Sequence, residues 1–169
     1  MISAGRALCA LLVPAALAGQ GKAPVYRGFS PGMTYRDFAA RARALSARDT
    51  LHCNTSENTA QLMECGVTIR DPADSARFYL SAYVIEGKVA MVSLGDSGDT
   101  RVVDRAKRDL TRRFGAGRPQ GVASLEWNTG HRVVRLSWRG RGAARWVYVN
   151  LSDYDLMERI SRYVKRAKS

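Results

Sequence analysis

The segment FYLSAYVIEGKVAMVSL, residues 78–94, decides the fold class. Two runs of apolar and β-branched residues, 78–85 and 89–94, flank the turn dipeptide Glu86-Gly87. Runs of this length around a glycine-containing turn are typical of an antiparallel β-hairpin. The sequence therefore predicts an antiparallel sheet that contains this hairpin.

A helix and a strand are predicted before the hairpin. Thr34 and Asp37 have the spacing of a capping box, which indicates the start of a helix over 34–47. Apolar residues recur there at helical spacing, at Phe38, Ala42 and Leu45. The segment 63–69 has strand character.

The order of elements repeats after the hairpin. A polar stretch, Asp96-Ser97-Gly98-Asp99, predicts a turn, and a second helix over 102–114 follows it. Three further strands are then predicted over 122–127, 132–138 and 145–151. A closing helix begins at Ser152, with Asp155 three residues on as its capping partner.

These elements predict an α+β fold made of two successive modules, each a helix followed by antiparallel strands, plus a C-terminal helix. The expected division is a signal peptide over 1–18, a flexible lead-in over 19–32, a first module over 33–98 and a second over 99–169. Because sheets of three short strands are marginal alone, we expect the two modules to share one core.

The N-terminus has the pattern of a secretory signal peptide. A short segment containing Arg6 precedes an apolar stretch, and Ala16-Leu17-Ala18 forms a small-x-small cleavage site. The apolar stretch is 12 residues long, whereas a transmembrane helix needs about 20. We therefore expect cleavage after Ala18 and a periplasmic or secreted protein with no transmembrane segment.

Removal of the signal peptide would take away Cys9 and leave two cysteines, Cys53 and Cys65. In an oxidising compartment an even pair predicts a disulfide. The alternative is a metal site that adds His52, but a fourth ligand is missing and the spacing is not that of a zinc finger. We expect neither a metal nor a cofactor.

One stretch resembles a known family. Gly32-Met33-Thr34 opens a helix that contains Asp37 and Phe38, and Val25-Tyr26 precedes it. Together with the antiparallel strands that follow, this resembles the small outer-membrane assembly lipoprotein family of Gram-negative bacteria. The resemblance implies a non-enzymatic domain of the cell envelope. The chain differs from that family in having no cysteine just after its apolar stretch and in its second module.

Two catalytic motifs are matched only in part. Gly28-Phe29-Ser30-Pro31-Gly32 has the form of a nucleophile elbow, but Pro31 has no N–H to donate to an oxyanion. Gly95-Asp96-Ser97-Gly98 is similar to a serine-protease motif, yet only 45 residues separate Ser97 from His52. We therefore expect no catalytic residue and no enzymatic activity.

The positive charge is concentrated in the second part of the chain. The protein has 169 residues and a net charge of +12. Residues 1–100 contain 10 basic and 9 acidic side chains, whereas 101–169 contain 17 basic and 6 acidic ones. Such an excess predicts an acidic partner.

Strand alternation brings part of this charge together with aromatic side chains. If the aliphatic residues of 132–138 and 145–151 face the core, the opposite face carries both kinds of side chain. The candidate ligand-binding residues on that face and its rim are Arg135, Arg139, Trp146, Tyr148 and Arg145. Cation–π packing that merely solubilises the sheet is the alternative interpretation.

The resulting hypothesis is an exported envelope protein that binds or scaffolds an anionic envelope component or an acidic protein. Peripheral membrane contact is compatible with it. The alternative is an enzyme or inhibitor that acts on an envelope polymer. A nucleic-acid binder comes third, because phosphate contacts would use the charge but nucleic acid is not the usual anion outside the cytoplasm.

Overall fold

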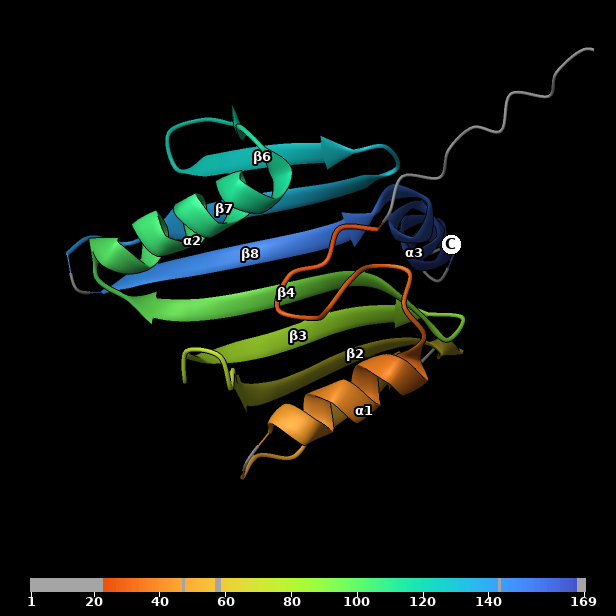
Figure 1. Ribbon diagram of the computed structural model, residues 1–169. Coiled ribbons are helices and arrows are strands. Elements are labelled where there is room, and N and C mark those ends of the chain that lie inside the picture. Colours follow the sequence, from red (N-terminus) through yellow and green to blue (C-terminus); the bar gives the residue numbers. More distant parts are fainter. Residues whose placement is uncertain (1–22, 47, 57–58, 143, 167–169) are drawn as a thin grey trace, which may run out of the picture.

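The strands of the protein form one continuous sheet with helices on both of its faces (Figure 1). The computed structural model describes residues 23–46, 48–56, 59–142 and 144–166. All neighbouring strands pair antiparallel, in the order β1-β2-β3-β4-β8-β7-β6-β5. The expected signal peptide lies outside the described residues.

The helices and strands follow one another as two series of a helix and four strands, and a last helix ends the described chain. They are α1 (Tyr35–Leu45), β1 (His52–Ser56), β2 (Thr59–Arg70), β3 (Arg77–Ile85), β4 (Lys88–Gly98), α2 (Thr100–Phe114), β5 (Arg118–Pro119), β6 (Ser124–Thr129), β7 (Arg132–Arg139), β8 (Arg145–Asp153) and α3 (Tyr154–Arg166).

The prediction of two successive helix-then-strands modules is wrong, although the coarse α+β class fits. Strands β1 to β4 form one antiparallel meander and β5 to β8 another, but the last strands of the two meanders pair with each other. This pairing runs from Met91 opposite Ser152 to Gly98 opposite Arg145. It removes one exposed edge from each half, and such an edge would be a row of unpaired N–H and C=O groups. The result is a single eight-stranded sheet.

Two strands at the edges were not predicted. Strand β1 has the polar sequence HCNTS, and β5 is two residues long and ends in Pro119. Neither has the alternating apolar residues that identify a half-buried strand. Short strands and proline are typical of sheet edges because they limit pairing with other chains.

Three predicted boundaries are also wrong. Asp96-Ser97-Gly98 continues β4 instead of forming a turn, because these residues pair with β8. Val122 precedes β6 and is fully exposed. Ser152 belongs to β8, and it is Asp153 whose side chain accepts a hydrogen bond from the N–H of Leu156 at the start of α3.

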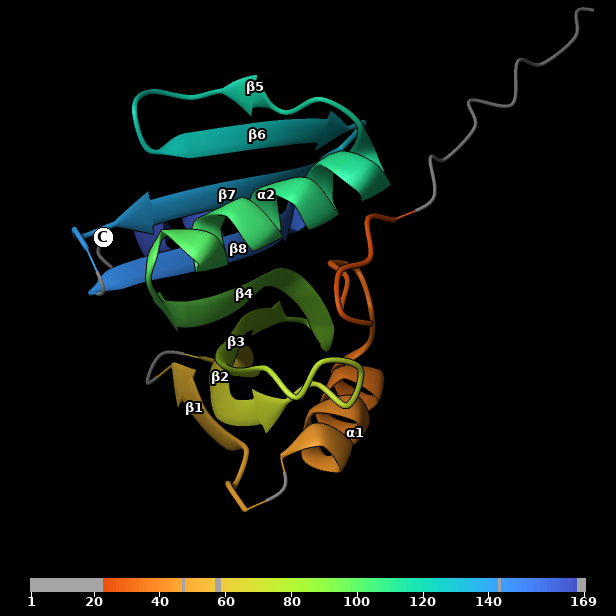
Figure 2. The same cartoon turned by 60° about the vertical axis from the view of Figure 1, so that its left-hand side comes forward.

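The core lies between the sheet and the two helices α1 and α2. The predicted capping of α1 by Thr34 is confirmed, and Phe38 and Ala42 face the sheet, as does Leu110 of α2. The predicted inward sets of β7 and β8 are confirmed too, since Leu136 and Leu151 are fully buried. These contacts place both helices on one face of the sheet (Figures 1 and 2).

Helix α3 lies on the opposite face, where it packs across β3, β4 and β8. An ion pair of 2.8 Å between Arg159 and Glu86 joins it to the β3–β4 turn. Val133 is buried on this covered end, whereas Tyr79 and Trp146 at the other end are about half exposed, at 54% and 48%. The outer face is therefore covered at one end and open at the other.

Within the described residues, no helix is long and apolar enough to cross a membrane.

Candidate functional site

The open end of the outer face carries a cluster of three aromatic rings and one arginine. We call this the aromatic–arginine cluster; its members are Tyr79 of β3, Arg139 of β7, and Trp146 and Tyr148 of β8. The register brings them together, because Gly95 of β4 lies between Tyr79 and Tyr148, and Arg139 is opposite Trp146. The cluster therefore crosses the junction between the two halves of the sheet.

The aromatic rings form a partly exposed surface. The rings of Trp146 and Tyr148 are stacked, with centroids 6.5 Å apart and planes 15° from parallel. Both side chains point outward because their neighbours Val147 and Val149 are buried in the core. Exposed aromatic residues that stay together on a rigid strand are a common feature of binding surfaces.

Arg139 holds its guanidinium beside this surface. Its Nη2 donates a hydrogen bond of 3.0 Å to the Tyr148 hydroxyl, and its Cζ lies 5.4 Å from the centroid of the same ring. No carboxylate of the described residues forms an ion pair with Arg139. The arginine is exposed, so its charge is oriented by the ring and remains available to an anion.

Arg135 has a different role from Arg139. Its Nε and Nη2 donate to one Glu126 carboxylate oxygen, at 3.1 and 2.6 Å, and Glu126 is only 8% exposed. A nearly buried carboxylate needs such a partner. The positive charge of Arg135 is therefore compensated, and its main role is to neutralise Glu126 at the rim.

The structure does not bring Arg145 into the cluster. Strand alternation gives Arg145 the same direction as Val147 and Val149, which face the helices, and opposite to Trp146. It is half-buried, and its Nε has no hydrogen-bond partner.

Sequence reasoning missed Tyr79, the fourth member of the cluster. A Cβ placed on Gly66 would collide with the Tyr79 hydroxyl, and one placed on Gly95 would lie 3.4 Å from the Tyr148 ring. The tyrosine rings therefore lie close to the strands above glycines. Glycine within a strand is a signal of such close approach, but the β4–β8 pairing that joins the two tyrosines is not visible in the sequence.

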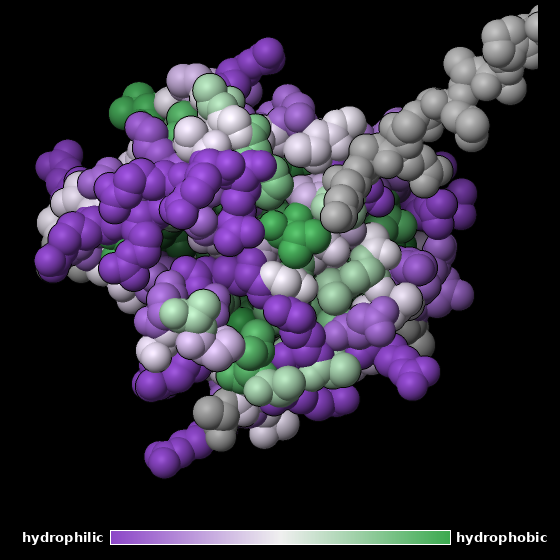
Figure 3. Space-filling model, in the orientation of Figure 1, coloured by the Kyte–Doolittle hydropathy of each residue, from purple (hydrophilic) through white to green (hydrophobic). Residues whose placement is uncertain are grey.

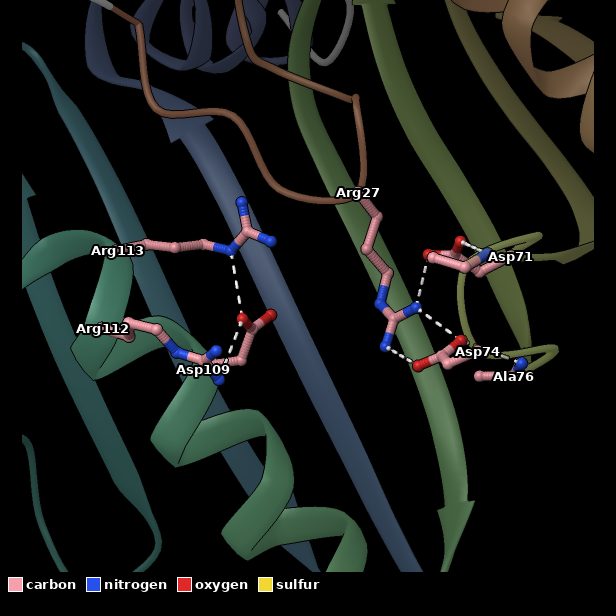
Figure 4. Close-up of polar contacts among 8 residues, drawn as sticks. Arg27, Asp71, Asp74, Ala76, Asp109, Arg112 and Arg113 are labelled. Carbon is pink, nitrogen blue, oxygen red and sulfur yellow. Dashed lines mark hydrogen bonds and ion pairs between the residues drawn. The ribbon is translucent and has the colours of Figure 1, made fainter.

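The face of the sheet that carries α1 and α2 has a second cluster of polar side chains, centred on Arg27 (Figure 4). Arg27 lies in the tight turn that Tyr26 and Phe29 close, and its guanidinium spans to the β2–β3 loop. There it bonds Asp71 at 2.5 Å and Asp74 at 3.0 and 3.2 Å. These bonds fasten the N-terminal segment to the loop.

The pKa directions in this region follow from burial and from these bonds. The hydrogen bond from Arg27 holds the pKa of the Asp74 carboxyl below its usual value. Burial disfavours the charged form of Arg27, but its hydrogen bonds to Asp74 and Tyr26 outweigh this and raise its pKa. Nearby, burial raises the pKa of Asp96, which has no ion pair among the described residues.

The predicted disulfide between Cys53 and Cys65 is confirmed. The two residues face each other in the β1–β2 register, so the bond attaches the edge strand to the sheet. The alternative metal site at these cysteines is therefore wrong. Among the described residues, no group of three or more histidine, cysteine, aspartate or glutamate side chains is arranged to hold a metal ion.

Comparisons of the chain with protein-family models, with curated proteins and with solved structures found no match.

Proposed function

We propose that the protein is an exported, non-catalytic envelope protein that binds a phosphate-bearing lipid surface through the aromatic–arginine cluster. The surface would be that of anionic phospholipid or of lipopolysaccharide. The observation that carries the proposal is the open end of the outer face, where Arg139, Tyr79 and Trp146 are exposed beside the partly buried ring of Tyr148 while α3 covers the other end. Aromatic rings suit the boundary between headgroups and acyl chains, and arginine suits phosphate.

The charge of the chain supports the same partner. The second part of the sequence, which contributes Arg139, holds nearly the whole positive excess, although the basic residues of α2 lie on the opposite face of the sheet. Each basic residue near an anionic membrane contributes about 1 kcal/mol to binding. Such attraction would draw the protein to an anionic surface before the rings make contact.

Export is supported by the N-terminal signal pattern and by the disulfide, which is compatible with an oxidising compartment. The resemblance of the stretch around Thr34 to the outer-membrane assembly lipoprotein family points to the same compartment.

A binding role in place of catalysis is supported by the surroundings of the cluster. The residues that pair with the cluster from neighbouring strands are glycine, serine and threonine. They do not give the cluster a nucleophile–base pair.

The test is cosedimentation of the purified full chain with vesicles of phosphatidylglycerol and phosphatidylcholine, with vesicles of phosphatidylcholine alone, and with lipopolysaccharide. We expect binding to the anionic vesicles or to lipopolysaccharide that weakens as salt is raised. Replacing Arg139 by glutamine should weaken it about fivefold. Trp146→Ala should weaken it further while leaving the charge unchanged.

The matched control is Arg36→Gln, which removes one exposed charge from α1 on the other face. Arg135 is not used, because its removal would leave buried Glu126 without a partner. Equal loss of binding in the Arg36 and Arg139 variants would mean that membrane binding depends on net charge alone. The cluster would then be rejected as the site.

A further inference from the structure

A cleft lies on the opposite face of the sheet, between α1 and α2. It has a volume of about 700 Å³, within the range of pockets that hold small molecules. Its walls are the two helices, and the β2–β3 loop and the Tyr26–Phe29 turn also line it. Helices α1 and α2 lie apart on this face of the eight-stranded sheet (Figure 2).

One wall of the cleft is a row of arginines on α2. Arg105, Arg108 and Arg112 line the cavity at intervals of three and four residues, which places them on one side of the helix. All three are exposed, and hydrophilic side chains cover α2 in the space-filling view (Figure 3). From the helical rise, the row extends over about 10 Å.

The facing wall contributes a further guanidinium. The side chain of Arg41 from α1 lies directly over Gly28, where a Cβ would collide with the guanidinium. The Arg41 Cζ lies 5.6 Å from the ring centroid of Phe29. Arg41 therefore packs against Gly28 and the ring of Phe29 at the cleft, and not against a carboxylate.

The carboxylates around the cleft are mostly engaged with other arginines. Arg27 bonds Asp71 and Asp74, and Arg113 bonds Asp109 at 3.2 Å, as Figure 4 shows. By contrast, Arg41, Arg105 and Arg108 make no ion pair with any described residue. Asp96 is the remaining acid of the lining, so the cleft carries an uncompensated positive charge.

The floor of the cleft is apolar. Strands β3, β4 and β8 contribute the side chains, and hydrophobic atoms are visible in the hollow beside α2 (Figure 3). The floor residues are Phe78, Leu94, Val147 and Val149. A small inorganic anion would use the arginines but not this floor, whereas a molecule with an apolar body would use both.

We infer that the cleft between α1 and α2 is a binding site for a small anionic amphiphile. Its phosphate or carboxylate group would pair with Arg105 and Arg108, and its apolar part would lie on the strand floor. Guanidinium groups suit both of these anions because they present parallel N–H donors. The site is separate from the aromatic–arginine cluster and does not depend on the function proposed for it.

The test is calorimetric titration of the purified full chain with dihexanoyl phosphatidic acid kept below its micelle-forming concentration. The comparison probes are dihexanoyl phosphatidylcholine and inorganic phosphate. We expect phosphatidic acid to bind more tightly than either, because only it combines an unshielded phosphate with acyl chains. Equal affinity for phosphatidylcholine would reject the role of the arginines, and equal affinity for inorganic phosphate would reject the role of the floor.

The double variant Arg105→Gln with Arg108→Gln should weaken phosphatidic acid binding tenfold or more. The control is Arg36→Gln with Arg43→Gln, which removes the same charge from exposed positions of α1 that do not line the cleft. Asp96→Asn should act in the opposite direction and tighten binding, because it removes the remaining negative charge. Similar affinities for the two double variants, or weaker binding to Asp96→Asn, would overturn the inference.

Discussion

Arg27 provides the sharpest prediction about what stabilises the fold. In Arg27→Ala, the Asp71 and Asp74 carboxylates lose their partner, and the rings of Phe78 and Tyr26 lose a guanidinium at 5.0 and 5.6 Å. The side chain of Arg27 is 17% exposed and that of Asp71 is 15% exposed, so this part of the network is shielded from water. Asp74 is more exposed, at 36%, and its ion pair counts for less.

The magnitude follows from these exposures. A hydrogen bond to a charged group contributes about 1.5–3 kcal/mol, which we assign to Asp71. The Asp74 pair adds about 0–1 kcal/mol as a surface ion pair. Stacking on the rings adds about 0.5–1 kcal/mol. We therefore expect Arg27→Ala to lower the free energy of unfolding by about 2–5 kcal/mol.

The assay is urea unfolding at pH 7, with Arg36→Ala as an exposed control that should change stability by less than about 0.5 kcal/mol. The pH dependence gives a second readout. Because Arg27 lowers the pKa of Asp74 in the folded protein, the stability from this pair is present above the unfolded pKa and is lost as pH falls through the folded one. The difference between wild type and Arg27→Ala should therefore shrink at pH 3. A loss below about 1 kcal/mol at pH 7, or a difference that grows in acid, would refute the role given to Arg27.

Three further changes test other parts of the fold. The Cys53–Cys65 bond closes a loop over a sequence separation of 12, so its reduction should cost about 3 kcal/mol, measured by urea unfolding with and without dithiothreitol. Asp153→Ala removes the α3 cap and the partner of Arg132 at 3.1 Å, and should lower stability by about 1–3 kcal/mol; unchanged thermal unfolding would contradict it. Trp127→Phe removes the hydrogen bond from the indole N–H to the Gly115 carbonyl at the end of α2, and should cost about 1 kcal/mol, with faster amide exchange in that last turn as its specific sign.

Local patterns in the sequence predict most elements because each depends on residues close together in the chain. The Thr34 cap and the alternation of β7 and β8 are examples, and the structure confirms both. Burial of one face also fixed which side chains of β8 point outward, so Trp146 and Tyr148 could be placed together.

The pairing of β4 with β8 could not be predicted, and it determines both the single sheet and the cluster. Both strands have the same alternating apolar pattern as their neighbours, so the pattern identifies a buried face but not a partner. Without that pairing, nothing relates Tyr79 to Tyr148. The place of Arg145 does not depend on it, because the alternation of β8 alone gives Arg145 the direction of Val147 and Val149. The cleft was missed for a related reason: the spacing of Arg105 and Arg108 defines a side of α2, but only the tertiary structure shows that this side faces α1 across a cleft with an apolar floor.

The most direct test of the proposed function is the solvent accessibility of Trp146, the most exposed of the three tryptophans. Acrylamide quenching of tryptophan fluorescence is measured with wild type and with Trp146→Phe, and the difference between them reports the indole of Trp146. We predict that anionic vesicles or lipopolysaccharide protect this indole from quenching and shift its emission to the blue, and that phosphatidylcholine vesicles do neither. If the protein binds anionic vesicles or lipopolysaccharide while Trp146 remains as quenchable as in free protein, the aromatic–arginine cluster is not the binding surface.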